Sequence, residues 1–197
     1  MAVKPSAESR KENLAGLAAD RMQRDGYSAL GLRELAAAAG LKAASLYSHF
    51  TSKDEMAIRA LASYEARQTA ELEQLMSLTR GADRLYGYIS MIAQTLLSKD
   101  RSCLALVLAV ERKAVVPELL ERVVAFADRN AAWLARAWQA GQADGSIRSD
   151  IAADTAGSLL FNGVEGAIAF SLVRCDAPQW FIGQADQLLQ ALGVTPR

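Results

Sequence analysis

The sequence predicts an all-α fold, and three observations lead to this expectation. Hydrophobic residues make up 51% of the 197 positions, and Ala and Leu, both strong helix formers, are abundant among them. Only four prolines interrupt the chain, and the β-branched and aromatic residues that favour strands are not enriched. Apolar residues recur at helical spacing along most of the sequence. We therefore expect a three-helix amino-terminal unit followed by a helical bundle of about six helices.

The first two helices are expected over residues 9–24 and 32–39. In the second, apolar side chains recur at i, i+3, i+4 and i+7, which places them on one face of a helix. Gly40 follows directly, and glycine readily adopts the left-handed conformation that ends a helix. A third short helix is expected over residues 43–50. Residues 32–50 are thus predicted to form a helix, a tight turn and a second helix.

The third predicted helix is too short to be a core element and carries mostly polar side chains. Leu46 and Phe50 lie on its inner face, and its outward residues are mainly hydrogen-bond donors. A helix-turn-helix places such a helix in the major groove of DNA, with phosphate contacts on either side. We expect base contacts from Lys42, Ala44 and Ser45, and phosphate contacts from Arg33, Tyr47, His49 and Lys53.

A long helix is expected over residues 51–78. Ser52 and Glu55 have the three-residue spacing of a capping box, and Asp54 and Glu55 place negative charge in the first turn. Five further helices are expected over residues 82–98, 103–113, 117–142, 152–173 and 178–192. Pro117 and Pro178 stand in the first turns of two of them, where proline is well tolerated.

Five short motifs lie between residues 26 and 55: GY at 26–27, LRELA at 32–36, AGL at 39–41, LYSHF at 46–50 and SKDE at 52–55. In this order and spacing they resemble the TetR family of bacterial transcriptional repressors. The resemblance implies a DNA-binding domain in residues 1–52 and an effector-binding and dimerisation domain in residues 53–197. It further implies a homodimer that binds a palindromic operator in double-stranded DNA and is released by a small-molecule effector.

Two positions depart from the family pattern. Gly31 stands where the family usually has Thr or Ser, so a hydroxyl that would cap the helix and contact phosphate is missing. Lys42-Ala43-Ala44 replaces the common Ser-Lys-Gly/Pro at the base-reading end of the third helix. The operator sequence of other members therefore does not carry over to this chain.

Charge is distributed unevenly along the chain. The formal net charge is zero, yet residues 1–53 contain eight Lys and Arg against five Asp and Glu, a net charge of +3. The remainder must carry −3. A basic amino-terminal part on an acidic body is typical of a DNA-binding protein, although chance could also produce so small an excess.

The predicted body helices carry large apolar and aromatic side chains at helical spacing, which is typical of a ligand site between helices or of plain core. Asn162 and Glu165 are polar residues in a strongly apolar helix, where each needs a partner, a dimer contact or a ligand. We expect a small, largely hydrophobic effector. The candidate ligand-binding residues are Tyr86, Met91, Cys103, Leu108, Phe126, Trp133, Phe161, Asn162 and Glu165.

The last two predicted helices are the expected dimer interface, because the resemblance implies a four-helix bundle between two chains. Small side chains at helical spacing in residues 152–173 would let two helices approach closely. The alternative is that both helices line the core of one monomer. The candidate interface residues are Ala156, Leu159, Gly163, Ala167, Phe170, Phe181 and Leu188.

The two cysteines, Cys103 and Cys175, are too few for a disulfide framework and lack metal-ligand spacing. Cys103 stands at the start of a predicted helix after Arg101, a setting that raises thiol reactivity. Sensing of electrophiles or oxidants by Cys103 is therefore a hypothesis beside the alternative of a small buried core residue.

Two other function classes were weighed against DNA binding. His49 follows Ser45 by four residues, but no acid is placed to orient it, and no phosphate-binding glycine loop, zinc spacing or carboxylate pair is present. We expect no enzyme, catalytic residue, metal or cofactor. A helical scaffold would not need outward donors around a short helix. The polar first residues and the charges that interrupt every apolar stretch predict a cytoplasmic protein without membrane contact.

Overall fold

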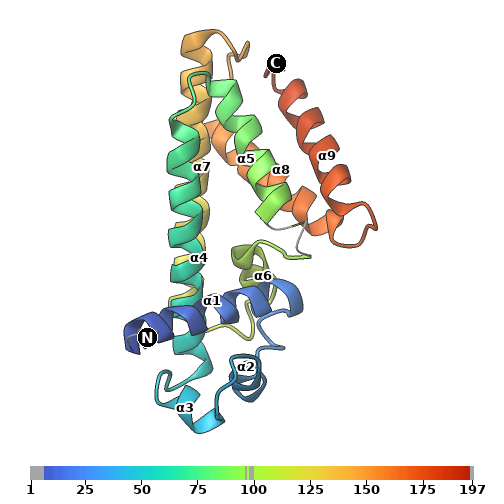
Figure 1. Cartoon of the computed structure of the whole chain (residues 1–197). Helices are drawn as coiled ribbons and strands as arrows, with labels where there is room; N and C mark the ends of the chain where they lie inside the picture. Colours follow the sequence, from blue (N-terminus) through green and yellow to red (C-terminus); the bar gives the residue numbers. More distant parts are fainter. Residues whose placement is uncertain (1–6, 96, 98–99, 196–197) are drawn as a thin grey trace, which may run out of the picture. The chain divides into compact units, whose positions relative to one another are not determined.

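The computed structural model describes residues 7–95, 97 and 100–195 (Figure 1). These residues form nine α-helices, and their only β-type pairing is an isolated bridge between Ile147 and Val194. The all-α prediction is confirmed. The helices are α1 (Ala7–Asp25), α2 (Leu32–Ala38), α3 (Ala43–Tyr47), α4 (Lys53–Met76), α5 (Gly81–Thr95), α6 (Leu104–Val110), α7 (Pro117–Asp144), α8 (Ala153–Ser171) and α9 (Ala177–Ala191).

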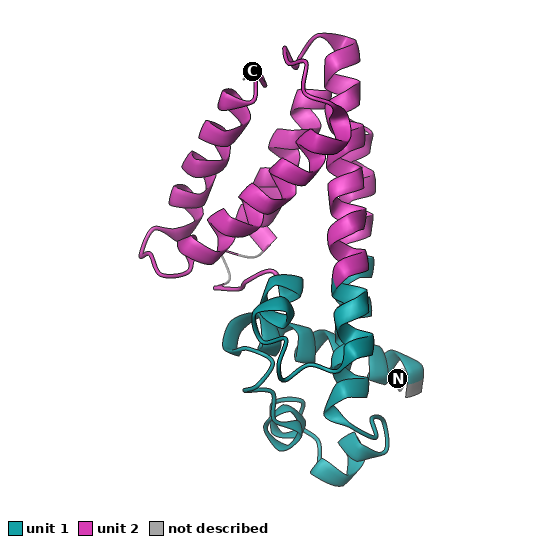
Figure 2. Cartoon of the chain, turned by 180° about the vertical axis from the view of Figure 1, so that it is seen from behind, with its two compact units in different colours: residues 1–67, 104–123 teal, residues 68–103, 124–197 magenta. Residues whose placement is uncertain are grey.

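The helices gather into two compact units (Figure 2). Unit 1 comprises residues 1–67 and 104–123, and unit 2 comprises residues 68–103 and 124–197. The chain passes between the units within α4, between Cys103 and Leu104, and within α7. This division by packing differs from the functional division expected after residue 52, because α6 packs against α1 in unit 1.

The turn between α2 and α3 forms as the sequence predicted. Gly40 has a φ of 67°, and the N–H of Leu41 donates to the carbonyl of Ala36 at 2.8 Å. This bond satisfies a carbonyl that the end of α2 would otherwise leave without a partner. Helix α3 ends at Tyr47, earlier than the expected residue 50, because His49 N–H donates to the carbonyl of Leu46 in a tighter turn.

The start of α4 is capped by two neighbouring residues. Ser52 Oγ accepts a hydrogen bond from the N–H of Glu55 at 3.0 Å, as the capping-box pattern predicts. The carboxylate of Glu55 accepts bonds from the N–H and hydroxyl of Thr51, each at 2.8 Å. These bonds, led by the one from the Thr51 backbone, and the nearby Lys11 hold the pKa of Glu55 at about 2.

Each unit has its own apolar core. In unit 1 the buried side chains come from α1 to α4 and include Leu14, Met22, Leu35, Leu46, Phe50, Met56 and Leu61. In unit 2 they include Leu85, Tyr88, Trp133, Trp138, Leu160 and Phe181. Helix α8 approaches α7 closely at Gly157, where an added Cβ would lie 2.9 Å from the backbone nitrogen of Ala135. Helix α9 packs against both α5 and α8.

Candidate functional site

Helix α3 presents one apolar and one polar face. Leu46 is 1% exposed, Phe50 is fully buried, and both anchor the helix to the core of unit 1. Ala44 and Tyr47 are exposed on α3, with Tyr47 at 50%, and Lys42 is exposed as its N-cap. Ser45 and His49 are half-buried. The structure thus brings together the side chains that the sequence assigned to bases and phosphates, on a helix whose opposite face holds it in place.

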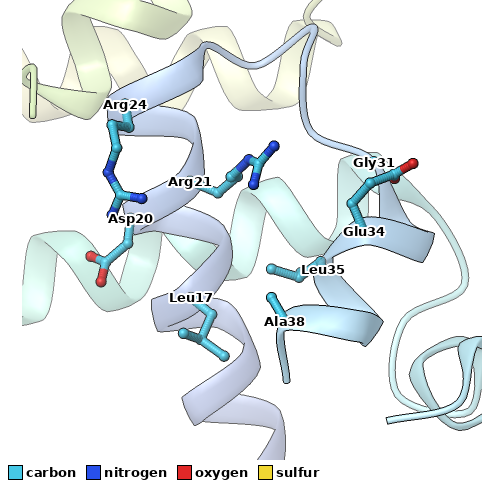
Figure 3. Close-up of a pocket in the computed structure, with 8 residues that line it drawn as sticks. All are labelled: Leu17, Asp20, Arg21, Arg24, Gly31, Glu34, Leu35 and Ala38. Carbon is cyan, nitrogen blue, oxygen red and sulfur yellow. The ribbon is translucent and has the colours of Figure 1, made fainter. Parts of the chain in front are cut away.

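The amino-terminal end of α2 shows the effect of Gly31. The residue is the N-cap of α2 and provides no side-chain hydrogen bond. The carboxylate of Glu34 lies where a side chain on Gly31 would be. A hollow of about 140 Å³ lies beside this helix end. The residues that line it are drawn in Figure 3: Leu17, Asp20, Arg21, Arg24, Gly31, Glu34, Leu35 and Ala38. Arg33 lies next to it and is exposed, as a phosphate contact requires.

Lys53 lies against the turn that joins α1 to α2. Its Nζ donates to the carbonyl oxygen of Ser28 at 3.2 Å and lies 4.3 Å from the centre of the Tyr27 ring, a cation–π contact. The hydroxyl of Tyr27 donates to Asp54 at 2.5 Å. The pKa of Tyr27 is raised well above its usual value, mainly by burial and next by the Asp54 carboxylate. The start of α4 therefore holds the α1–α2 turn by polar contacts.

Glu111, directly after α6, holds the same turn from another part of unit 1. Its carboxylate accepts hydrogen bonds from the N–H groups of Tyr27 and Ser28, each at 2.8 Å, and from the Ser28 hydroxyl. Gly26 has a φ of 93°, and a Cβ there would lie 2.6 Å from Glu111 Oε1. Burial acts to raise the pKa of Glu111, but the bonds from Ser28 and Tyr27 outweigh it, and the pKa is lowered.

The candidate effector residues differ in how exposed they are, and they do not all lie in the same unit. Cys103, Phe126, Trp133 and Phe161 are buried in unit 2, whereas Tyr86, Met91 and Glu165 are half-buried there. Asn162 lies exposed on α8, where a dimer contact, one of the alternatives given for it, needs a surface position. Leu108 is buried in unit 1, so it packs with the amino-terminal helices instead.

Glu165 has the most unusual surroundings of these candidates. Although the residue as a whole is half-buried, its Oε2 atom is buried and has no hydrogen-bond partner among the described residues. Burial raises its pKa to about 7, and a hydrogen bond with the Cys103 side chain acts in the opposite direction. Glu165 and Cys103 both lie close enough to Tyr88 to contribute, after burial, to the raised pKa of that phenol.

Tyr88 was missed by reasoning from the sequence, which selected Tyr86 on the same helix. The Tyr88 ring stacks on Trp133, with 5.7 Å between ring centroids and 26° between planes. Tyr88 is 2% exposed and shares the inner face of α5 with Leu85, Ile89 and Ile92. This helical spacing was the signal that could have identified it.

The candidate dimer residues also differ in burial. Leu159 and Phe170 are 48% and 70% exposed on α8, as an interface between chains requires. Ala156 and Phe181 are fully buried, which corrects their assignment to a surface: they belong to the core of unit 2. Gly163 faces α9, where an added Cβ would lie 2.6 Å from Leu188.

Residues 17–60 match the family model described as bacterial regulatory proteins of the tetR family. The part of the chain that contains α2 and α3 is thus similar to the tetR family. The fold agrees with a TetR-family transcriptional regulator from Agrobacterium tumefaciens at a TM-score of 0.85 and 20% identity, covering 95% of this chain and 100% of that one. A TetR regulator from Legionella pneumophila matches at a TM-score of 0.81 and 17% identity, covering 98% and 100%.

A third solved structure, a transcriptional regulator from Saccharomonospora viridis in complex with choline, matches at a TM-score of 0.80 and 19% identity over 98% of this chain and 100% of that one. The comparison with curated proteins returned no match. None of the helices in the described residues is long and apolar enough to cross a membrane.

Removal of the Glu111 carboxylate tests its hold on the α1–α2 turn. Glu111→Ala leaves two backbone N–H groups without their acceptor, and we expect the free energy of unfolding to fall by about 1–3 kcal/mol. Amide exchange of Tyr27 and Ser28 should accelerate. Glu118→Ala is the control, because Glu118 pairs with the exposed Arg122 at 3.3 Å, and its loss should cost about 0.5 kcal/mol at most. Equal losses in the two variants would contradict the assignment.

The pH dependence of stability tests the surroundings of Glu165. Its folded-state pKa is raised to about 7, so its contribution to stability is complete below the unfolded pKa of 4.5 and is lost as pH rises through 7. The loss amounts to about 3 kcal/mol. Glu165→Gln lacks this titration and should be the more stable protein at pH 8.5, with little difference at pH 4.5. Thermal unfolding of both proteins between pH 4.5 and 8.5 measures this difference in stability. A difference that does not change with pH would refute the raised pKa.

Proposed function

We propose that this protein is a TetR-family repressor that binds a palindromic operator as a homodimer and is released by a small effector. One observation carries the DNA-binding part: Ala44 and Tyr47 are exposed on α3, Lys42 is exposed as its N-cap, and the buried Leu46 on α3 and Phe50 just after it anchor this segment. Lys42, Ala44 and Ser45 would read base edges in the major groove. As a bacterial DNA-binding protein it would act in the cytoplasm.

The phosphate contacts are assigned to side chains around α3. Arg33 and Tyr47 are exposed on neighbouring helices, and the half-buried His49 stands at the end of α3. Lys53 keeps further N–H donors beside its bond to Ser28, because an ammonium group has three. Phosphate contacts set the position of a protein on DNA, whereas base contacts set its sequence preference.

The dimer is proposed to form through the exposed face of α8. Leu159 and Phe170 are 48% and 70% exposed on α8, and Val173, in the turn after it, is 84% exposed. Gly166 and Ala169 are also exposed on α8, and their small size allows close approach of a second helix. A short recognition helix reads few base pairs, so two half-sites read by two chains are needed for specific binding.

A continuous series of contacts and bonds supports an effector response. Glu165 contacts Cys103, which immediately precedes α6, and Glu111 immediately follows α6. Helix α6 is about 10 Å long at 1.5 Å per residue and joins these two positions along the chain. Glu111 in turn holds Tyr27 and Ser28 at the start of the helix-turn-helix. An effector that prefers one arrangement of this series would shift the population of DNA-binding conformers.

The relative solved with choline supports a small-molecule effector. Sensing through a reactive thiol is the alternative. Cys103 is only 2% exposed, which favours its role as a buried side chain beside Glu165. We therefore retain the reversible ligand response as the proposal.

Binding to the DNA that flanks the gene of the regulator tests the repressor assignment. We expect salt-sensitive, sequence-selective binding by fluorescence anisotropy. Lys42→Ala should change the preferred bases, whereas Arg33→Ala should weaken binding to all sequences and reduce the salt slope by about one unit. Arg122→Ala, which removes an exposed arginine outside α1 to α4, should bind like the wild type. No selective binding by the wild type would overturn the proposal.

The oligomeric state tests the role of α8. Phe170→Asp should raise the dimer dissociation constant at least about 30-fold, the effect of losing an interface hot spot. Analytical ultracentrifugation measures this change. Val124→Asp places the same charge at a 60% exposed apolar residue of α7 and should leave the dimer intact. A Phe170→Asp protein that stays dimeric would exclude α8 as the interface.

A further inference from the structure

We propose that Glu165 is the anchor for the ammonium group of the effector, which is an amine with an apolar or aromatic body. The inference rests on the proposed ligand response and names the chemical class of its ligand. It replaces the largely hydrophobic effector expected from the sequence with one that carries a positive charge.

The first observation is the open oxygen of Glu165. Its Oε2 is buried without a hydrogen-bond partner among the described residues, although a carboxylate that leaves water normally gains donors in exchange. The Cys103 side chain is the one hydrogen-bond partner identified for this carboxylate. A thiol is a weak donor and carries no compensating positive charge. The Oε2 atom is therefore an unused acceptor that can bind an N–H donor of a ligand.

The second observation is an aromatic pair beside this carboxylate. Tyr88 stacks on Trp133 and lies within electrostatic reach of Glu165. Trp133 is 4% exposed, and its Nε1–H has no hydrogen-bond partner in the described part of the chain. Aromatic faces attract cations, and the unpaired N–H can donate to an acceptor on the ligand. Phe161, one turn before Glu165 on α8, adds an apolar wall.

The donor set favours an organic cation over a metal ion. Among the described residues no three His, Cys, Asp or Glu side chains come together as metal ligands. Glu165 and Cys103 alone would leave most of a coordination sphere unfilled. A protonated amine needs only one carboxylate oxygen, and its hydrocarbon part suits the buried Tyr88, Trp133 and Phe161.

The protonation of Glu165 agrees with this role. With its pKa raised to about 7, the side chain is partly neutral at physiological pH, which lessens the cost of leaving the site empty. A bound ammonium would favour the ionised form. Because Cys103 immediately precedes α6, a ligand that takes over the Glu165 carboxylate would alter the contact at the start of that helix.

Matched amines and alcohols test the proposal on the full-length protein. The probes are three pairs of increasing size: butylamine and butanol, 2-phenylethylamine and 2-phenylethanol, tryptamine and tryptophol. By isothermal titration calorimetry at pH 7.5 we expect at least one amine to bind at least about tenfold more tightly than its alcohol. Glu165→Gln should remove this difference by weakening the amine alone, whereas Glu121→Gln, which changes an exposed carboxylate, should leave it unchanged.

Several outcomes would overturn the inference. These are equal binding of amine and alcohol, no binding of any amine, or an unchanged preference in Glu165→Gln. If Glu165→Gln does not fold, Trp133→Phe, which keeps an aromatic ring, is the second variant. The comparison of amines with alcohols on the wild type still tests whether the site prefers a positively charged ligand. Operator binding without ligand is measured in parallel. Intact operator binding with no amine preference refutes this inference alone, whereas absent operator binding refutes the proposed function.

Discussion

The geometry of the helix-turn-helix depends on the hydrogen bonds between Glu111 and the turn that joins α1 to α2. Two backbone N–H groups in this turn have no helical partner, and the Glu111 carboxylate accepts both. Gly26 makes room for it through a positive φ and the absence of a Cβ. Because α2 and α3 follow directly, the Glu111 carboxylate holds the turn from which the helix-turn-helix starts.

Helix α6 lies between two sets of side-chain contacts although it is short. The helix has seven residues, too few to be stable in isolation, and it is held by packing against α1. Cys103 at one end contacts Glu165, and Glu111 at the other contacts Tyr27 and Ser28. Because α6 is so short, few contacts within the helix itself oppose a conformational change at either end.

Local signals in the sequence were sufficient for most of the fold. Gly40 predicted the turn before α3, and Ser52 predicted the start of α4, because both depend on neighbours within four residues. The role of Glu111 could not be predicted, since its partners lie more than 80 residues away. The apolar periodicity of α8 and α9 did not separate core from interface. Phe181 is buried and Phe170 is exposed, and the choice depends on how α9 packs against α8.

The contacts of Lys53 have a consequence for the speed and cost of DNA binding. A free lysine side chain loses up to about 2 kcal/mol of rotamer entropy when it is fixed in one position. The bond to Ser28 and the stacking on Tyr27 already restrict Lys53 before any DNA arrives. In the proposed phosphate contact of Lys53, the charge would already be held in position, so the entropy cost of ordering this side chain would be met on folding and not again on DNA binding.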